Sequence, residues 1–150
     1  MKNLLILLLF TPFMLLSQNT PKAKKAYAKA VEFYQESNDK KAKELVQSAI
    51  RQDANYLPSY LLLGQLEEEG GNIELAIYNY LKGISDNNPD NAWGYWKVGM
   101  LYMQIPNYVE AQRAFNHFLN FKYQKTKKIE SARKELKNCE FSIDAIANPK

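Results

Sequence analysis

The chain has 150 residues, enough for one domain, and its 10 Tyr, 7 Phe and 2 Trp supply enough large side chains for a packed core, which argues against intrinsic disorder. One cysteine and one histidine exclude an internal disulfide framework, a multi-cysteine metal site and a histidine metal cluster. The formal charge of +4 is unevenly placed: residues 30–121 hold seven basic and twelve acidic residues, whereas residues 122–137 hold seven basic residues against two acidic ones.

The first element is an apolar segment near the N-terminus. Lys2 precedes a run from Leu4 to Leu16 that is apolar apart from Thr11 and Pro12, and small or polar residues follow it. This order is typical of a secretory signal peptide, which we predict at residues 1–17, and the run is too short to span a membrane as a helix. We therefore expect an exported protein with no membrane span after signal removal. An uncleaved anchor is the alternative.

From about residue 23 onward, small and large apolar residues recur with a period close to 34. Gly64 and Gly99 occupy equivalent positions, and Ala30 stands about one period before Gly64. A repeat of this length is typical of helical arrays, in which each unit is a pair of helices and neighbouring units stack to bury their apolar faces. The predicted array covers residues 22–123, with units at about 23–56, 57–91 and 92–123.

Local signals divide each unit into two helices. The expected pairs are 22–36 with 39–52, 57–70 with 73–86, and 92–105 with 107–122. Asn38, Asn72 and Asn107 are placed to cap the second helix of each pair, and Gly70-Gly71 favours a left-handed helix end. A small residue on each helix predicts that the two helices cross closely: Ala30 with Ala42, Gly64 with Ala76, and Gly99 with Ala111.

The last predicted element is a capping helix within residues 124–147, running from Thr126 to about Ala145, with a tail at 148–150. Apolar residues recur there at spacings of three and four, which predicts one apolar stripe: Ile129, Ala132, Leu136, Cys139 and Ile143. A helical array needs such an element to cover its last open face. Cys139 lies on this stripe, so we interpret it as a small buried hydrophobe and not as a nucleophile.

The repeated positions resemble the tetratricopeptide repeat, whose pattern reads W-x2-L-G-x2-Y and then A-x3-F. The matching residues are Tyr60, Leu63, Gly64, Ala76 and Tyr80 in the second unit, and Tyr95, Gly99, Tyr102, Ala111 and Phe115 in the third. Glu67 departs from the pattern, because the family usually has an aromatic residue there. The resemblance implies an all-α fold: a right-handed superhelical array of three helix hairpins plus a C-terminal capping helix.

The resemblance also implies where a partner would bind, because the first helices of such arrays line a concave groove. The implied partner-binding residues are Tyr27, Val31, Tyr34, Leu61, Gln65, Glu68, Trp93, Trp96, Met100 and Met103. Tryptophan and methionine on one face suit an apolar anchor from a peptide or partner helix. Packing against neighbouring helices or the chain's own tail is the alternative. Tyr27 and Val31 stand where chaperone-cofactor arrays carry carboxylate-binding side chains, so we expect no clamp for a C-terminal carboxylate.

A second resemblance covers residues 131–149. It runs through Ser131-Ala132-Arg133-Lys134-Glu135-Leu136, continues through Asn138 to Ile146, and ends at Asn148-Pro149. This stretch is similar to the linker that follows the tetratricopeptide array in Gram-negative envelope proteins of the OmpA family, including PorE-like proteins of the type IX secretion apparatus. It implies a periplasmic or outer-membrane-associated location. The propeller and OmpA-like functions of those proteins are not carried over.

No residue pattern predicts catalysis. His117 is interpreted as a surface side chain, and Gly70-Gly71 lacks the spacing and the lysine of a phosphate-binding loop. Glu67, Glu68 and Glu69 point about 100° apart on a helix, so they cannot converge on one proton or metal ion; we expect a solvated helix end. We therefore predict no enzymatic activity, no cofactor and no metal.

These observations predict an exported protein–protein interaction scaffold of the Gram-negative envelope, linked to an outer-membrane, peptidoglycan-associated or type IX secretion assembly. Its expected partner is a protein or peptide of the envelope, and no nucleic acid is expected. Two alternatives stay open. One is an accessory or regulatory subunit that presents substrate to a separate enzyme, and the other is a polyanion or nucleic-acid binder that uses the basic stretch Lys122 to Lys137.

Overall fold

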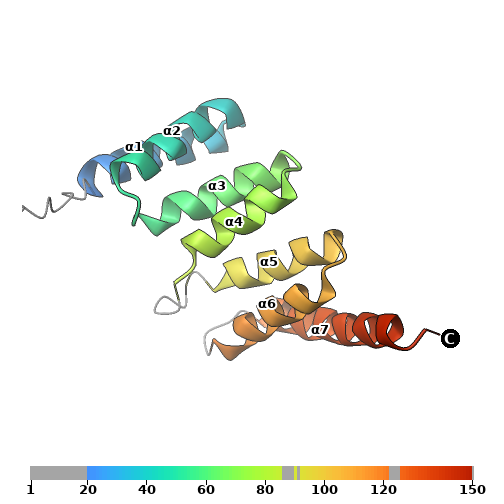
Figure 1. Cartoon of the computed structure of the whole chain (residues 1–150). Coiled ribbons are helices and arrows are strands. Elements are labelled where there is room, and N and C mark those ends of the chain that lie inside the picture. The colour runs from blue at the N-terminus through green and yellow to red at the C-terminus, as the bar shows by residue number, and fades with distance from the viewer. Residues whose placement is uncertain (1–19, 86–89, 91, 122–125, 150) are drawn as a thin grey trace, which may run out of the picture.

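The structure is a computed structural model, and it describes residues 20–85, 90, 92–121 and 126–149 (Figure 1). The predicted signal peptide lies outside the described residues. The described part of the chain is all-α, as predicted, and its helices closely follow the expected ranges. They are α1 Thr20–Gln35, α2 Asp39–Gln52, α3 Leu57–Glu69, α4 Ile73–Gly83, α5 Trp93–Gln104, α6 Tyr108–Asn120 and α7 Thr126–Ala147.

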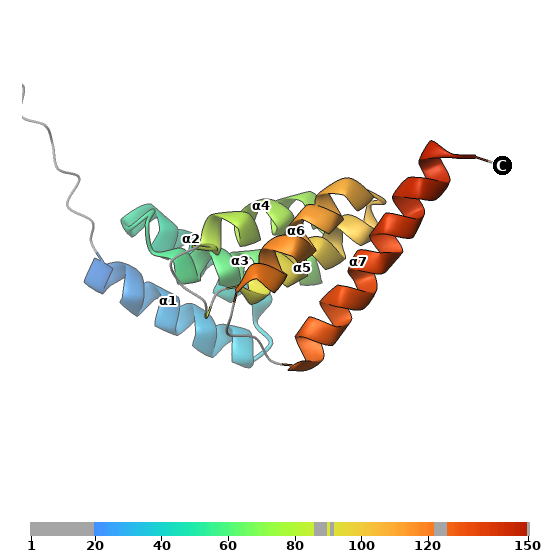
Figure 2. The same cartoon turned by 90° about the horizontal axis from the view of Figure 1, so that it is seen from below.

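The helices pair in chain order, α1 with α2, α3 with α4 and α5 with α6, and each pair packs on the next. Seen from below, α1, α3 and α5 form one layer and α2, α4 and α6 form the other (Figure 2). These are the sequential hairpins that the repeat predicts. The arrangement places the first helix of every unit on the same side of the array.

Two of the three predicted asparagine caps are present. The side-chain oxygen of Asn38 accepts a hydrogen bond from the backbone N–H of Lys41 at 3.3 Å, and that of Asn107 accepts one from Glu110 at 3.3 Å. Asn72 occupies the N-cap position of α4, as predicted, but its side chain makes no cap bond, and its NH2 group donates to the Glu67 carboxylate at 2.9 Å. Gly71 just before it has a φ of 76°, as a left-handed helix end requires.

The close helix crossings predicted at Gly64 and Gly99 are confirmed. A Cβ atom on Gly64 would lie 3.0 Å from the Tyr80 ring, and one on Gly99 would lie 2.6 Å from the Phe115 ring. Both rings are fully buried. In the second and third units, the aromatic ring of the second helix therefore rests directly on the backbone of the first helix. The distance at Gly99 leaves no room for a Cβ atom unless the ring moves, and the distance at Gly64 would make a tight contact.

The capping role of α7 is also confirmed. Ala132 and Cys139 on α7 are fully buried, and Leu136 packs between them against a cluster that contains Phe115 and Phe118 of α6. Because α7 covers these rings, the last hairpin does not expose its apolar face. Among the helices that the structure describes, none combines the length and the apolar character needed to cross a membrane.

Candidate functional site

The predicted binding residues lie mostly on the side of the array formed by α1, α3 and α5. Nine of the ten are half-buried: Tyr27, Val31, Tyr34, Gln65, Glu68, Trp93, Trp96, Met100 and Met103. We call this set the first-helix face. Half-buried side chains are held in place by their neighbours and still present part of their surface to a partner.

Leu61, the tenth predicted residue, is a core residue. Only 8% of its surface is exposed, and a Cβ atom on Gly83 would lie 2.7 Å from its side chain. A Cβ atom on Gly94 at the start of α5 would lie 3.6 Å from the same side chain. Leu61 therefore fills the junction between the second and third units, and the expectation that it lines an accessible groove is corrected.

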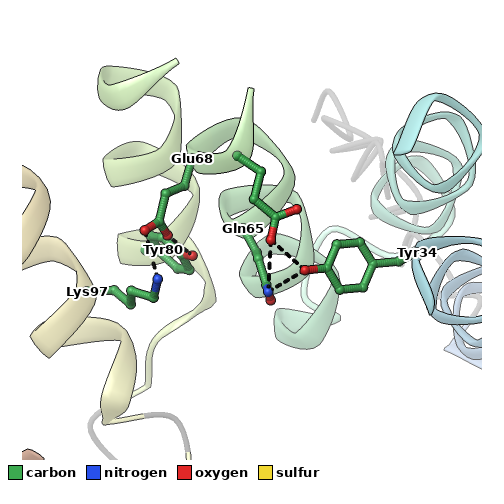
Figure 3. Close-up of polar contacts among 6 residues, drawn as sticks. Tyr34, Gln65, Glu68, Tyr80 and Lys97 are labelled. Carbon is green, nitrogen blue, oxygen red and sulfur yellow. Dashed lines mark hydrogen bonds and ion pairs between the residues drawn. The ribbon is translucent and has the colours of Figure 1, made fainter. Parts of the chain in front are cut away.

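A first polar cluster joins the first unit to the second (Figure 3). The Tyr34 hydroxyl on α1 donates to the Glu69 carboxylate on α3 at 2.5 Å. The Gln65 side-chain amide donates to the Tyr34 oxygen at 2.6 Å and to Glu69 at 3.3 Å. The hydrogen bond to Glu69 and partial burial raise the pKa of Tyr34 to about 12. The phenol thus stays protonated at neutral pH and acts as the donor that links the two helices.

A second polar cluster joins the second unit to the third (Figure 3). The Tyr80 hydroxyl on α4 donates to Glu68 on α3 at 2.6 Å, and the Lys97 ammonium on α5 pairs with the same carboxylate at 2.7 Å. Burial and this hydrogen bond raise the pKa of Tyr80 well above its usual range. Glu68 therefore connects three helices at the middle of the first-helix face.

The expectation that Glu67, Glu68 and Glu69 form a solvated helix end is wrong for the first two. Glu67 is only 4% exposed, and it accepts hydrogen bonds from Lys43 on α2 at 2.8 Å and from Asn72 at 2.9 Å. Because successive helix positions point about 100° apart, the three carboxylates face three different neighbours. The repeat pattern contained an indication that Glu67 is buried, because Glu67 stands where the tetratricopeptide repeat usually has an aromatic residue.

The two tryptophans of α5 lie against α7. The Lys128 ammonium on α7 sits 5.6 Å from the centre of the Trp93 ring and 5.2 Å from that of Trp96. The Trp96 indole N–H also donates to the Ser131 hydroxyl at 3.4 Å. Packing against a neighbouring helix, part of the alternative considered for these residues, thus applies to both tryptophans. Lys128 was predicted to have a role only as part of the basic stretch Lys122 to Lys137.

The neighbouring sulfur atoms complete this contact between α5 and α7. The thiol of Cys139 lies 3.3 Å from the Met103 sulfur and is fully buried, which raises the pKa of the thiol.

His117 is exposed, as expected, and stacks on the Tyr95 ring with 5.1 Å between ring centres. Within the described residues, no three His, Cys, Asp or Glu side chains are grouped so that they could hold a metal ion.

Comparison with known proteins identifies the fold. No protein-family model matches the chain, and no curated protein matches it in sequence. The Arabidopsis OM64 TPR domain superposes with a TM-score of 0.68 at 20% identity, covering 80% of this chain and 98% of that one. The fold is tetratricopeptide-like.

Two further solved structures with this fold contain bound peptides. The Yersinia enterocolitica type III secretion chaperone SycD, in complex with a peptide of the translocator YopD, gives a TM-score of 0.66 at 18% identity, over 79% of this chain and 92% of that one. The first TPR of Spaghetti (RPAP3), bound to an HSP90 peptide, gives 0.67 at 12% identity, over 84% and 98%. Identities this low show a shared fold alone.

Proposed function

We propose that this protein is an interaction scaffold that binds a peptide or helix of a partner protein on its first-helix face. The observation that carries the proposal is the run of half-buried side chains across three successive units. Two separate polar clusters hold this run: Tyr34 and Gln65 with Glu69, and Glu68 with Tyr80 and Lys97. This face combines aromatic and thioether groups, which suit apolar anchors, with fixed hydrogen-bonding groups, which suit the polar atoms of a peptide.

Preorganisation supports the same proposal. The hydrogen bonds of Tyr34 and Gln65 restrict their side chains before a partner arrives, so less conformational entropy is lost on binding. The tetratricopeptide-like SycD and RPAP3 domains were solved with peptides bound, which is the kind of ligand that we propose here. The acidic and basic groups of this face are paired with each other and with phenols, an arrangement that suits recognition better than proton transfer.

A pair of double variants tests the proposed face. Tyr34→Ala with Gln65→Ala removes two half-buried side chains of this face, whereas Leu75→Ala with Tyr78→Ala removes side chains that are 51% and 56% exposed on α4. A partner captured by the wild-type protein is identified, purified and titrated against both variants. We expect about tenfold weaker binding for the first variant, which corresponds to about 1.4 kcal/mol, and a change below about twofold for the second.

Weaker binding by Leu75→Ala with Tyr78→Ala, and unchanged binding by Tyr34→Ala with Gln65→Ala, would place the binding site on α4. Equal affinity of both variants and the wild type would remove the first-helix face as the binding site. Circular dichroism of each variant serves as the control for folding, because Tyr34 and Gln65 contribute hydrogen bonds between units as well as surface.

We further propose that the scaffold is exported to the Gram-negative cell envelope and works in an outer-membrane, peptidoglycan-associated or type IX secretion assembly. Two sequence features support this: the apolar run Leu4 to Leu16, and the similarity of residues 131–149 to the linker of PorE-like proteins. In the native host, intact-mass analysis of periplasmic protein is expected to give a chain that begins near Gln18. Protein that retains Met1 and fractionates with the cytoplasm would contradict export.

A further inference from the structure

The tryptophan pair of α5 has a feature that the scaffold proposal does not use. We propose that Trp93 and Trp96 form a binding position for a cationic side chain, lysine or arginine, of the partner, and that Lys128 occupies this position in the free protein. This inference rests on the proposed function, because it names the chemistry of one contact on the first-helix face.

The geometry of the pair is that of a cation site. The Lys128 ammonium lies 5.6 Å and 5.2 Å from the two ring centres, within the distance at which a cation is attracted to an indole face. Trp93 meets the Tyr80 ring edge-on, with 5.7 Å between ring centres, and the Trp96 N–H donates to Ser131. Both indoles are therefore held by neighbours, so the position is already formed before a partner arrives.

The charge around the pair favours the same occupant. The faces of the indole rings carry the negative part of the ring quadrupole. The carboxylate of Glu68 lies on the same side of the array. It accepts a hydrogen bond from Tyr80, whose ring contacts Trp93. Two lysines of the protein contact these groups: Lys97 forms an ion pair with Glu68, and Lys128 lies over the indole rings. An arriving cation would thus replace an internal one at a position that already holds a positive charge.

Displacement of Lys128 is energetically accessible. Each of the two cation–π contacts, partly exposed, is worth about 0.5–1 kcal/mol, and a released lysine regains side-chain entropy. Lys128 also stands near the start of α7, two residues after Thr126, while the buried anchors of that helix, Ala132 and Cys139, lie further along. Its side chain can therefore leave the rings while the rest of α7 stays packed.

The protein carries its own reporter for this site. Its two tryptophans are the two members of the pair, so all intrinsic tryptophan fluorescence comes from this position. The full chain is titrated with tetramethylammonium chloride, with sodium chloride adjusted to keep the ionic strength constant. We compare the wild type with Lys128→Gln, which removes the internal cation, Lys128→Arg, which keeps one, and Lys127→Gln, which removes an exposed lysine one position earlier.

We expect Lys128→Gln to bind tetramethylammonium about fivefold more tightly than the wild type, the equivalent of about 1 kcal/mol of removed competition. Lys128→Arg and Lys127→Gln should match the wild type. Equal or weaker binding by Lys128→Gln would overturn the proposal and leave Lys128 as a structural contact of α7. Melting temperatures of the variants check that α7 stays packed on the array. If Lys128→Gln lowers the melting temperature, the titration is repeated with Lys128→Met, which keeps an apolar side chain in place of the lysine stem.

The titration contains no partner protein, so its failure is distinguishable from failure of the scaffold proposal. A negative titration with a positive result for Tyr34 and Gln65 would leave a peptide-binding face that uses no cation site. The reverse outcome is tetramethylammonium binding as expected, with a partner titration that removes the first-helix face as the binding site. This outcome would leave a cation site that the partner does not use and would equally overturn the proposed role.

Discussion

A chain that ends at Tyr123 is expected to aggregate or to lose cooperative unfolding, because it lacks α7. Phe115 and Phe118 on α6 are fully buried in a cluster to which α7 contributes Ala132, Leu136 and Cys139. Burial of one large apolar side chain is worth about 1.5–3 kcal/mol. Loss of the α7 side chains from this cluster, with exposure of the apolar surface that they cover, would therefore remove much of the 5–15 kcal/mol or so that typically separates a folded domain from its unfolded state.

A second truncation provides the control. A chain that ends at Ser142 keeps the buried part of the stripe up to Cys139 and loses the end of α7, where Ile146 is 70% exposed. Thermal melts followed by circular dichroism, with sedimentation to detect aggregates, should show near wild-type behaviour for this control. A soluble, sharply melting chain that ends at Tyr123 would show that α7 is a linker and that the third hairpin is stable without a cap.

Replacing Gly99 by leucine is expected to destabilise the array by about 1–3 kcal/mol, the usual cost of overpacking a core. Even a Cβ atom at this position would lie 2.6 Å from the Phe115 ring, so α5 and α6 must separate to admit a side chain. The sign of the effect is informative. In an unhindered helix the same change would stabilise by roughly 0.5–1 kcal/mol, because glycine is a poor helix former.

Urea unfolding of the single and double variants measures this contact. Phe115→Ala alone is expected to cost about 3–5 kcal/mol by leaving a cavity. Combined with Gly99→Leu it should cost less than the sum of the two single changes, because the leucine gains the space that the ring vacates. Additive effects, or a stabilising Gly99→Leu, would contradict the close crossing of α5 and α6.

The repeat alone was sufficient to predict the helices, their pairing and the close crossings. Each of these depends on local or periodic features, such as Gly99 opposite Phe115, the caps at Asn38 and Asn107, and the apolar stripe through Cys139. The side chain of Asn72 stands at the start of α4 but does not cap it. Its NH2 group donates to the buried carboxylate of Glu67, and no backbone N–H of α4 donates to its side-chain oxygen.

The candidate site could be predicted only in part. Repeat register indicated which side of the array α1, α3 and α5 would share, and nine of the ten predicted residues are half-buried there. It did not show that Leu61 fills the junction between units, since that depends on how closely the third unit packs at Gly94. It also did not show which partner each carboxylate of α3 would find.

The sequence by itself thus determined the all-α repeat architecture of this protein, because helix periodicity, caps and small residues at crossings act over a few neighbouring positions. The tertiary structure alone decided the pairing of Glu67 with Lys43, the bridge from Tyr34 to Glu69, and the position of Lys128 over Trp93 and Trp96. Each of these contacts joins residues from different units or from the capping helix. Their distances depend on how the hairpins stack, which the spacing of residues along the chain does not specify.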